Sequence, residues 1–108
     1  PAEQLNKEME AAEYVISRSG YSTIMDIAAL QKKSILVPTP GQTEQEYLGK
    51  YLMKNKMAFT VAQKDFNLDE ALFSAKNFNY MPFPVTATEN LKKTIHDFFS
   101  QLSNPSLG

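Results

Sequence analysis

Short apolar runs alternate with longer segments of helical periodicity along this chain. Three of the runs are compact and rich in β-branched or aromatic residues, and they occupy residues 14–17, 34–37 and about 58–62. Runs of this length between polar turns are typical of buried strands. Because a helix-length segment separates each run from the next, the pattern predicts an α/β fold: a three-stranded parallel sheet in sequential order, with flanking helices on both faces.

The other segments place apolar residues on one side of a helix. Ile24, Ile27 and Ala28 mark such a side in a helix that ends near residue 31. Further helices are predicted at about 2–12, 44–54, 67–76 and 86–102. The last of these carries a regular stripe, which we interpret as core packing, made of Leu91, Ile95, Phe98, Phe99 and Leu102. We expect residues 77–84 to form a loop.

Two of these helices begin with the residue pattern of a side-chain cap. Asn67 is followed three positions later by Glu70, and Thr86 by Glu89. An oxygen at the first position accepts from the backbone N–H three residues on, which is why this spacing marks a helix start.

The composition limits the classes of protein to consider. A chain of 108 residues with 43% hydrophobic content allows one domain of ordinary size, here residues 1–102 with a tail at 103–108. Eleven basic residues against twelve acidic ones leave a net charge of −1, so we expect no nucleic-acid partner. No apolar run approaches the roughly 20 residues of a transmembrane segment. We expect a cytoplasmic location, with any membrane association peripheral.

The sequence lacks the residues that several kinds of chemistry need. Cysteine is absent, which excludes disulfides and thiol nucleophiles. His96 is the single histidine and stands in a charged stretch, so we expect it at the surface. The sequence holds no metal-ligand cluster, catalytic triad or Walker-type loop. No metal or cofactor is expected, and no catalytic residue is assigned.

The first strand ends on a short polar turn that opens directly into a helix. This turn consists of Ser19, Gly20, Tyr21, Ser22 and Thr23. The first N–H groups of a helix lack intrahelical partners and carry partial positive charge, so such a turn can bind a diphosphate. Asp26, one turn further on, has the chemistry to accept hydroxyl protons from a ribose. The alternative is an ordinary turn capped by a hydroxyl, with Asp26 complementing the helix dipole.

A second junction of this kind follows the second strand. Its planar polar side chains suit sugar hydroxyls, and they are Gln42, Glu44, Gln45 and Glu46. The alternative is structural, because Thr43 with Glu46 has the spacing of a capping box. Arg18 ends the first strand, where its guanidinium either meets an anion or ties down the turn. Both junctions are expected side by side at one edge of the sheet, where open α/β sheets bind ligands.

The two junctions together resemble a known family. The stretches Ser17-Arg18-Ser19-Gly20-Tyr21-Ser22-Thr23-Ile24-Met25-Asp26 and Val37-Pro38-Thr39-Pro40-Gly41-Gln42-Thr43-Glu44-Gln45-Glu46-Tyr47-Leu48 resemble the C-terminal donor-binding domain of family 28 glycosyltransferases. The resemblance implies half of a Rossmann-like domain from a two-domain GT-B enzyme that transfers a sugar from a nucleotide diphosphate, with inversion and without metal. It also implies that the acceptor site and general base belong to an N-terminal domain or subunit, a partner that this chain does not hold.

The resemblance further implies roles for single residues. Tyr21, Ser22 and Thr23 would line the diphosphate, Asp26 would hold the ribose, and Gln45 with Glu46 would face the donor sugar, with a UDP-sugar as the expected donor. The family commonly has glutamate at position 26, two glutamines at positions 45 and 46, and asparagine where this chain has Gly49. These departures concern the identity of the sugar more than the nucleotide site.

Three functions are therefore compatible with the sequence. The leading hypothesis is a fragment of a glycosyltransferase, inactive by itself, with further βα units upstream of Pro1. A nucleotide-sugar epimerase or hydrolase of the same architecture is the first alternative. The second is a non-catalytic donor-binding subunit that needs a partner chain.

Overall fold

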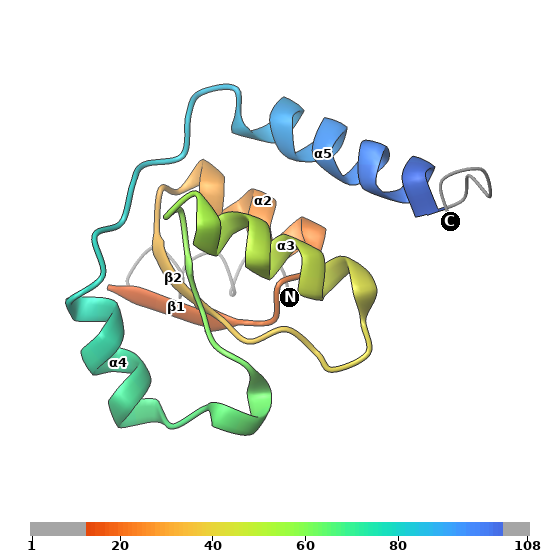
Figure 1. The fold of residues 1–108 in the computed structure, drawn as a ribbon. Helices are drawn as coiled ribbons and strands as arrows, with labels where there is room; N and C mark the ends of the chain where they lie inside the picture. Colours follow the sequence, from red (N-terminus) through yellow and green to blue (C-terminus); the bar gives the residue numbers. More distant parts are fainter. Residues whose placement is uncertain (1–12, 103–108) are drawn as a thin grey trace, which may run out of the picture.

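The computed structural model describes residues 13–102, which form one parallel sheet with helices on either side (Figure 1). The strands are β1 (Tyr14–Ser17), β2 (Lys33–Leu36) and β3 (Phe59–Thr60). They lie in the order β1-β2-β3, and both neighbouring pairs are parallel. The predicted sheet order is confirmed. The helix predicted at 2–12 and the tail at 103–108 lie outside the described residues.

Two strands differ from their predicted bounds. β2 begins and ends one residue early, and β3 contains two residues instead of the five expected from 58–62. The pairing nevertheless extends past β3, because the N–H of Val61 donates to the carbonyl of Leu36 at 3.0 Å. β3 has a hydrogen-bonded neighbour on one side within the described sheet, so little backbone pairing holds it in register.

The helices alternate with the strands as the sequence pattern predicts. They are α2 (Tyr21–Ala29), α3 (Thr43–Lys54), the short 3₁₀ helix η1 (Gln63–Asp65), α4 (Leu68–Lys76) and α5 (Ala87–Leu102). α2 ends two residues before position 31, and Gln31 takes a positive φ of 52° in the turn that follows. The cap of α4 is confirmed, because Asn67 Oδ1 accepts from the N–H of Glu70 at 3.0 Å.

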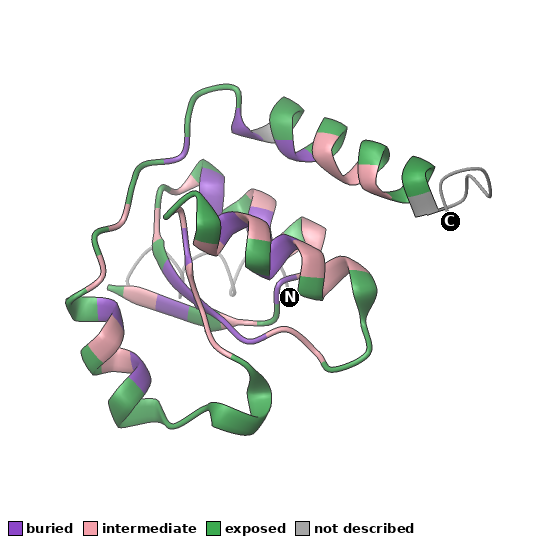
Figure 2. Ribbon diagram, in the orientation of Figure 1, coloured by how far each residue is buried: buried purple, intermediate pink, exposed green. Residues whose placement is uncertain are grey.

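Two apolar clusters pack on opposite faces of the sheet (Figure 2). The larger one lies under α2, α3 and α5 and includes Ile24, Leu36 and Leu48, which are almost wholly buried. The smaller one joins Ile35 of β2 to Ala71 and Ala75 of α4. Helices therefore cover both faces of the sheet, which leaves the carboxyl ends of the strands as the edge where loops can form a site.

α5 packs over α2 through one side only. Leu91 is buried and Ile95 packs against the larger cluster, as the predicted stripe requires. The ring of Phe98 stacks on Tyr47 with centroids 4.0 Å apart, whereas Phe99 is 38% exposed. His96 is exposed, as predicted. Among the described helices, α5 included, none combines the length and apolar character needed to cross a membrane.

The connection from α4 to α5 is held by side chains at the other end of the sheet. The Tyr80 hydroxyl donates to the carbonyl of Ser34 at 2.7 Å. Burial, together with the neighbouring Tyr14, raises the pKa of Tyr80, so its hydroxyl remains a donor at neutral pH. The Gln31 carboxamide both donates to and accepts from the backbone of Phe83, at 2.8 and 2.9 Å. These bonds attach the loop predicted at 77–84 to the sheet.

Candidate functional site

The two strand–helix junctions meet at the carboxyl edge of the sheet, as the sequence predicts. Ser19, which is wholly buried, donates its hydroxyl to the carbonyl oxygen of Gln45 at 2.7 Å. Arg18 donates from Nη1 to the carbonyl oxygen of Val37 at 3.1 Å, which supports the interpretation that Arg18 ties down the turn. The start of α2 is therefore tied directly to the first turn of α3 and to the end of β2.

The junction between β1 and α2 presents unpaired backbone donors. Gly20 is the N-cap of α2, with φ −70° and ψ 151°, and no side chain caps the helix. Ile24 makes the first helical bond, to the carbonyl of Gly20 at 3.0 Å. The N–H groups of residues 21–23 precede that bond and meet no acceptor within residues 13–102. A Cβ built on Gly20 would meet nothing within 4 Å, so there is open space beside the N-cap.

The side chains predicted to line a diphosphate differ in exposure. Ser19 turns its hydroxyl into the protein, so any contact it makes with a ligand has to come from its backbone. Tyr21 packs partly against the apolar core, while Ser22 is exposed. Asp26 is also exposed, and its carboxylate has no hydrogen-bond or ion-pair partner in the described part of the chain. The available donors are thus mainly backbone N–H groups.

The junction between β2 and α3 is a tight turn with a different character. Gln42 donates its N–H to the carbonyl of Thr39 at 3.0 Å, and Gly41 has φ +84°. Together with Pro40 at the second position, this is the pattern of a type II β-turn. The Gln45 side chain braces the turn, because its Oε1 accepts from the N–H of Thr39 at 2.9 Å. One of the predicted sugar contacts therefore also has a structural role.

The predicted capping box at this junction is wrong. The N-cap of α3 is Gln42 and makes no side-chain cap, while Thr43 already belongs to the helix. The turn places Gln42 before the helix, and its carbonyl accepts from the N–H of Glu46 at 2.9 Å. Glu44 and Glu46 lie in the first turn of α3, where carboxylates complement the positive end of the dipole.

Gly49 allows α3 to lie very close to the end of the sheet. A Cβ at this position would come within 2.9 Å of Pro38 Cγ and 3.0 Å of Thr60 Cγ2. The Thr60 hydroxyl also donates to the carbonyl of Gly49 at 2.8 Å. A side chain such as asparagine therefore does not fit here without movement. The sequence showed that the residue departs from the family pattern, but not that this position is packed.

The predicted residues line more than one hollow. Glu46 borders a pocket of about 400 Å³ between α3 and the end of β3. Tyr21 and Glu44 border another hollow, of about 330 Å³, beside α5. Within residues 13–102, no three histidine, aspartate or glutamate side chains gather closely enough to hold a metal ion.

Comparison with known proteins assigns the family. The model of the glycosyltransferase family 28 C-terminal domain matches residues 2–101, which is nearly the whole chain. The chain belongs to this family. The family 28 resemblance of the two junction motifs is therefore confirmed, and so is the Rossmann-like α/β fold.

The relatives share one enzyme name: UDP-N-acetylglucosamine--N-acetylmuramyl-(pentapeptide) pyrophosphoryl-undecaprenol N-acetylglucosamine transferase. The protein from Methylobacterium radiotolerans is 30% identical over 92% of this family 28 chain and 28% of its own length. Those from Rhodopseudomonas palustris and Caldicellulosiruptor saccharolyticus are 38% and 41% identical over 57% of the chain and 17% of their own lengths. The chain thus spans less than a third of these relatives. No solved structure matches it significantly.

Proposed function

We propose that this chain is the donor-binding part of a glycosyltransferase and that it holds the diphosphate of a UDP-sugar at the start of α2. The observation that carries the proposal is the uncapped first turn of α2, which contains no acidic residue and has open space in front of Gly20. A helix start of this kind favours an anion through its free N–H groups and its dipole. Family membership and the donor named for the relatives support the choice of a UDP-sugar.

The same donors serve the chemical step. In glycosyl transfer, an acceptor oxygen bonds to the anomeric carbon as the bond from that carbon to the diphosphate oxygen breaks. Negative charge accumulates on the departing diphosphate, and N–H groups already aimed at it stabilise the transition state more than the ground state. We assign the acceptor and the base that takes its proton to a part of the enzyme outside this chain, and no metal to the step.

Neighbouring side chains supply the remaining contacts of the proposed site. Asp26 stands about one turn beyond the diphosphate donors, and its exposed carboxylate is assigned to the ribose hydroxyls. At the adjoining junction, Glu46 and the amide nitrogen of Gln45 are assigned to the donor sugar, while Gln45 Oε1 stays on the turn. Gln42 and Glu44 lie next to them at the start of α3.

Titration of the chain with UDP, followed by amide NMR, tests the nucleotide site. The amides of residues 20–23 should shift first, and Asp26→Asn should weaken binding about tenfold, as expected for the loss of charge-assisted bonds worth roughly 1.5 kcal/mol. Asp69→Asn is the matched control, because it removes an exposed carboxylate from α4 on the other face of the sheet. Shifts confined to α5, or equal affinities for both variants, would contradict the proposal.

A further inference from the structure

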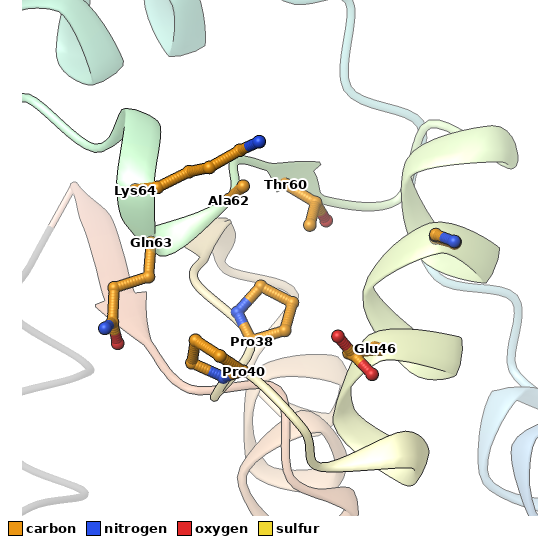
Figure 3. Close-up of a pocket in the computed structure, with 8 residues that line it drawn as sticks. Pro38, Pro40, Glu46, Thr60, Ala62, Gln63 and Lys64 are labelled. Carbon is orange, nitrogen blue, oxygen red and sulfur yellow. The ribbon is translucent and has the colours of Figure 1, made fainter.

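A pocket of about 400 Å³ lies beside the first turn of α3, at the carboxyl ends of β2 and β3 (Figure 3). It is lined by Pro38, Pro40, Glu46, Lys50, Thr60, Ala62, Gln63 and Lys64. The prolines form the middle of the pocket, with Glu46 on one side and Lys64 on the opposite side. Of these residues, Glu46 is the one that the sequence pattern predicts to be part of a binding site.

The charged groups at the rim have no ion-pair partner within residues 13–102. Glu46 and Lys50 stand four residues apart on α3, the spacing at which helices commonly form an ion pair. No ion pair joins them, and neither Lys50 nor Lys64 meets a carboxylate in the part of the chain that the structure describes. Two ammonium groups and one carboxylate therefore remain available, giving the rim a net positive charge.

The floor of the pocket is apolar and held in place. Pro38 and Pro40 have rigid rings, and Ala62 adds a methyl group. The wall is fixed by the bond from the Thr60 hydroxyl to the carbonyl of Gly49 and by the close approach of Gly49 to Pro38. A pocket with an apolar floor and a few convergent polar groups is the usual form of a small-molecule site.

The pocket and the proposed diphosphate site are linked through residues at the start of α3. Ser19, which precedes the start of α2, donates to the carbonyl of Gln45, and Gln45 is followed by Glu46. A position built on Gly49 lies 3.7 Å from Ser19 Oγ and 2.9 Å from the pocket residue Pro38. Both sites therefore adjoin the first turn of α3.

We propose that the pocket receives a donor sugar that carries a carboxylate, as a hexuronic acid does. This inference rests on the proposed function. The C–H faces of a pyranose ring suit the proline floor, and its hydroxyls suit the Glu46 carboxylate. The sugar carboxylate lies between Lys50 and Lys64, whose two charges balance those of Glu46 and the ligand. A neutral sugar would leave one of the two lysine charges unbalanced.

Calorimetric titration of the chain with UDP, UDP-glucose and UDP-glucuronate at low ionic strength tests this inference. UDP-glucuronate should bind about two- to fivefold more tightly than UDP-glucose, since ion pairs at an exposed rim are worth up to about 1 kcal/mol. The double variant Lys50→Gln/Lys64→Gln should bind the two sugars equally while keeping its affinity for UDP. Lys54→Gln, a change on the same helix away from the pocket, should keep the preference.

The outcomes separate this inference from the proposed function. Equal binding of the two sugars by the unchanged chain, with UDP still bound, overturns the inference alone. Loss of the preference in Lys54→Gln also overturns it, because the effect would then be one of overall charge. Failure of all three ligands to bind overturns both the inference and the proposed function.

Discussion

The two strand–helix junctions are alike in topology but opposite in electrostatics. The start of α2 has no acidic residue and no cap, whereas the first turn of α3 carries Glu44 and Glu46. An anion is therefore favoured at α2, while at α3 the two carboxylates already complement the dipole. Position at the sheet edge alone does not decide what a junction binds, because the residues of the first helical turn determine its charge.

The junctions also differ in how their backbones are held. The turn before α3 relies on local constraints, namely Pro40, the positive φ of Gly41 and the bond from Thr39 to Gln45. The turn before α2 relies on a constraint from a residue distant in the sequence, because the buried hydroxyl of Ser19 donates to the carbonyl of Gln45. One junction is thus stiff by itself, and the other depends on its neighbour for its shape.

Gly49→Asn should have the largest effect, because it tests the packing that brings the two junctions together. The new Cβ would collide with Pro38 and Thr60, and overpacking of this kind costs about 1 to 3 kcal/mol of unfolding free energy. Lys50→Asn, at the next and exposed position of α3, should cost less than about 0.7 kcal/mol through helix propensity alone. Urea unfolding compares the two; equal losses would show that α3 moves away easily.

Ser19→Ala should follow, with a loss of about 1 to 2 kcal/mol. The change leaves the carbonyl of Gln45 without the hydroxyl that it accepts from in a buried setting. Ser22→Ala removes an exposed hydroxyl from the same turn and should change stability by less than about 0.5 kcal/mol. If the two variants unfold at the same urea concentration, the bond between the junctions contributes little.

Gly41→Ala should cost about 1 kcal/mol, since a side chain is disfavoured at a φ of +84°. The damage should remain at the turn before α3. Amide NMR should accordingly show shifts around residues 39–45 and little change at residues 20–23. Equal shifts at both junctions would contradict the view that this turn is held locally.

Gly20→Asp should have the smallest effect on stability and should make the two junctions alike. A cap on α2 is expected to stabilise the chain by a few tenths of a kcal/mol, because glycine is already a tolerable N-cap. The added carboxylate should at the same time weaken UDP binding by occupying and repelling the anion site. Gly20→Ser, which caps without charge, is the matched comparison. Unchanged UDP affinity in the aspartate variant would argue against a diphosphate at α2.

Elements formed by local interactions could be predicted from the sequence. The order of strands and helices follows from apolar periodicity, and the cap of α4 joins Asn67 to Glu70 only three residues away. The predicted start of α3 was wrong by one residue, because two overlapping sequence signals compete there. Thr43 and Glu46 match a capping box, but the Pro40–Gly41 turn places Gln42 at the cap.

The sequence by itself determined the family, the alternation of strands and helices, and the two junctions as candidate sites, because each depends on residues that are close along the chain. Only the tertiary structure decided that Ser19 faces inward, since its partner Gln45 lies 26 residues away. The contact of Thr60 with Gly49, and the charged pocket that it helps to shape, likewise join separate elements. Such contacts arise when helices pack on a sheet, and spacing along the sequence does not encode them.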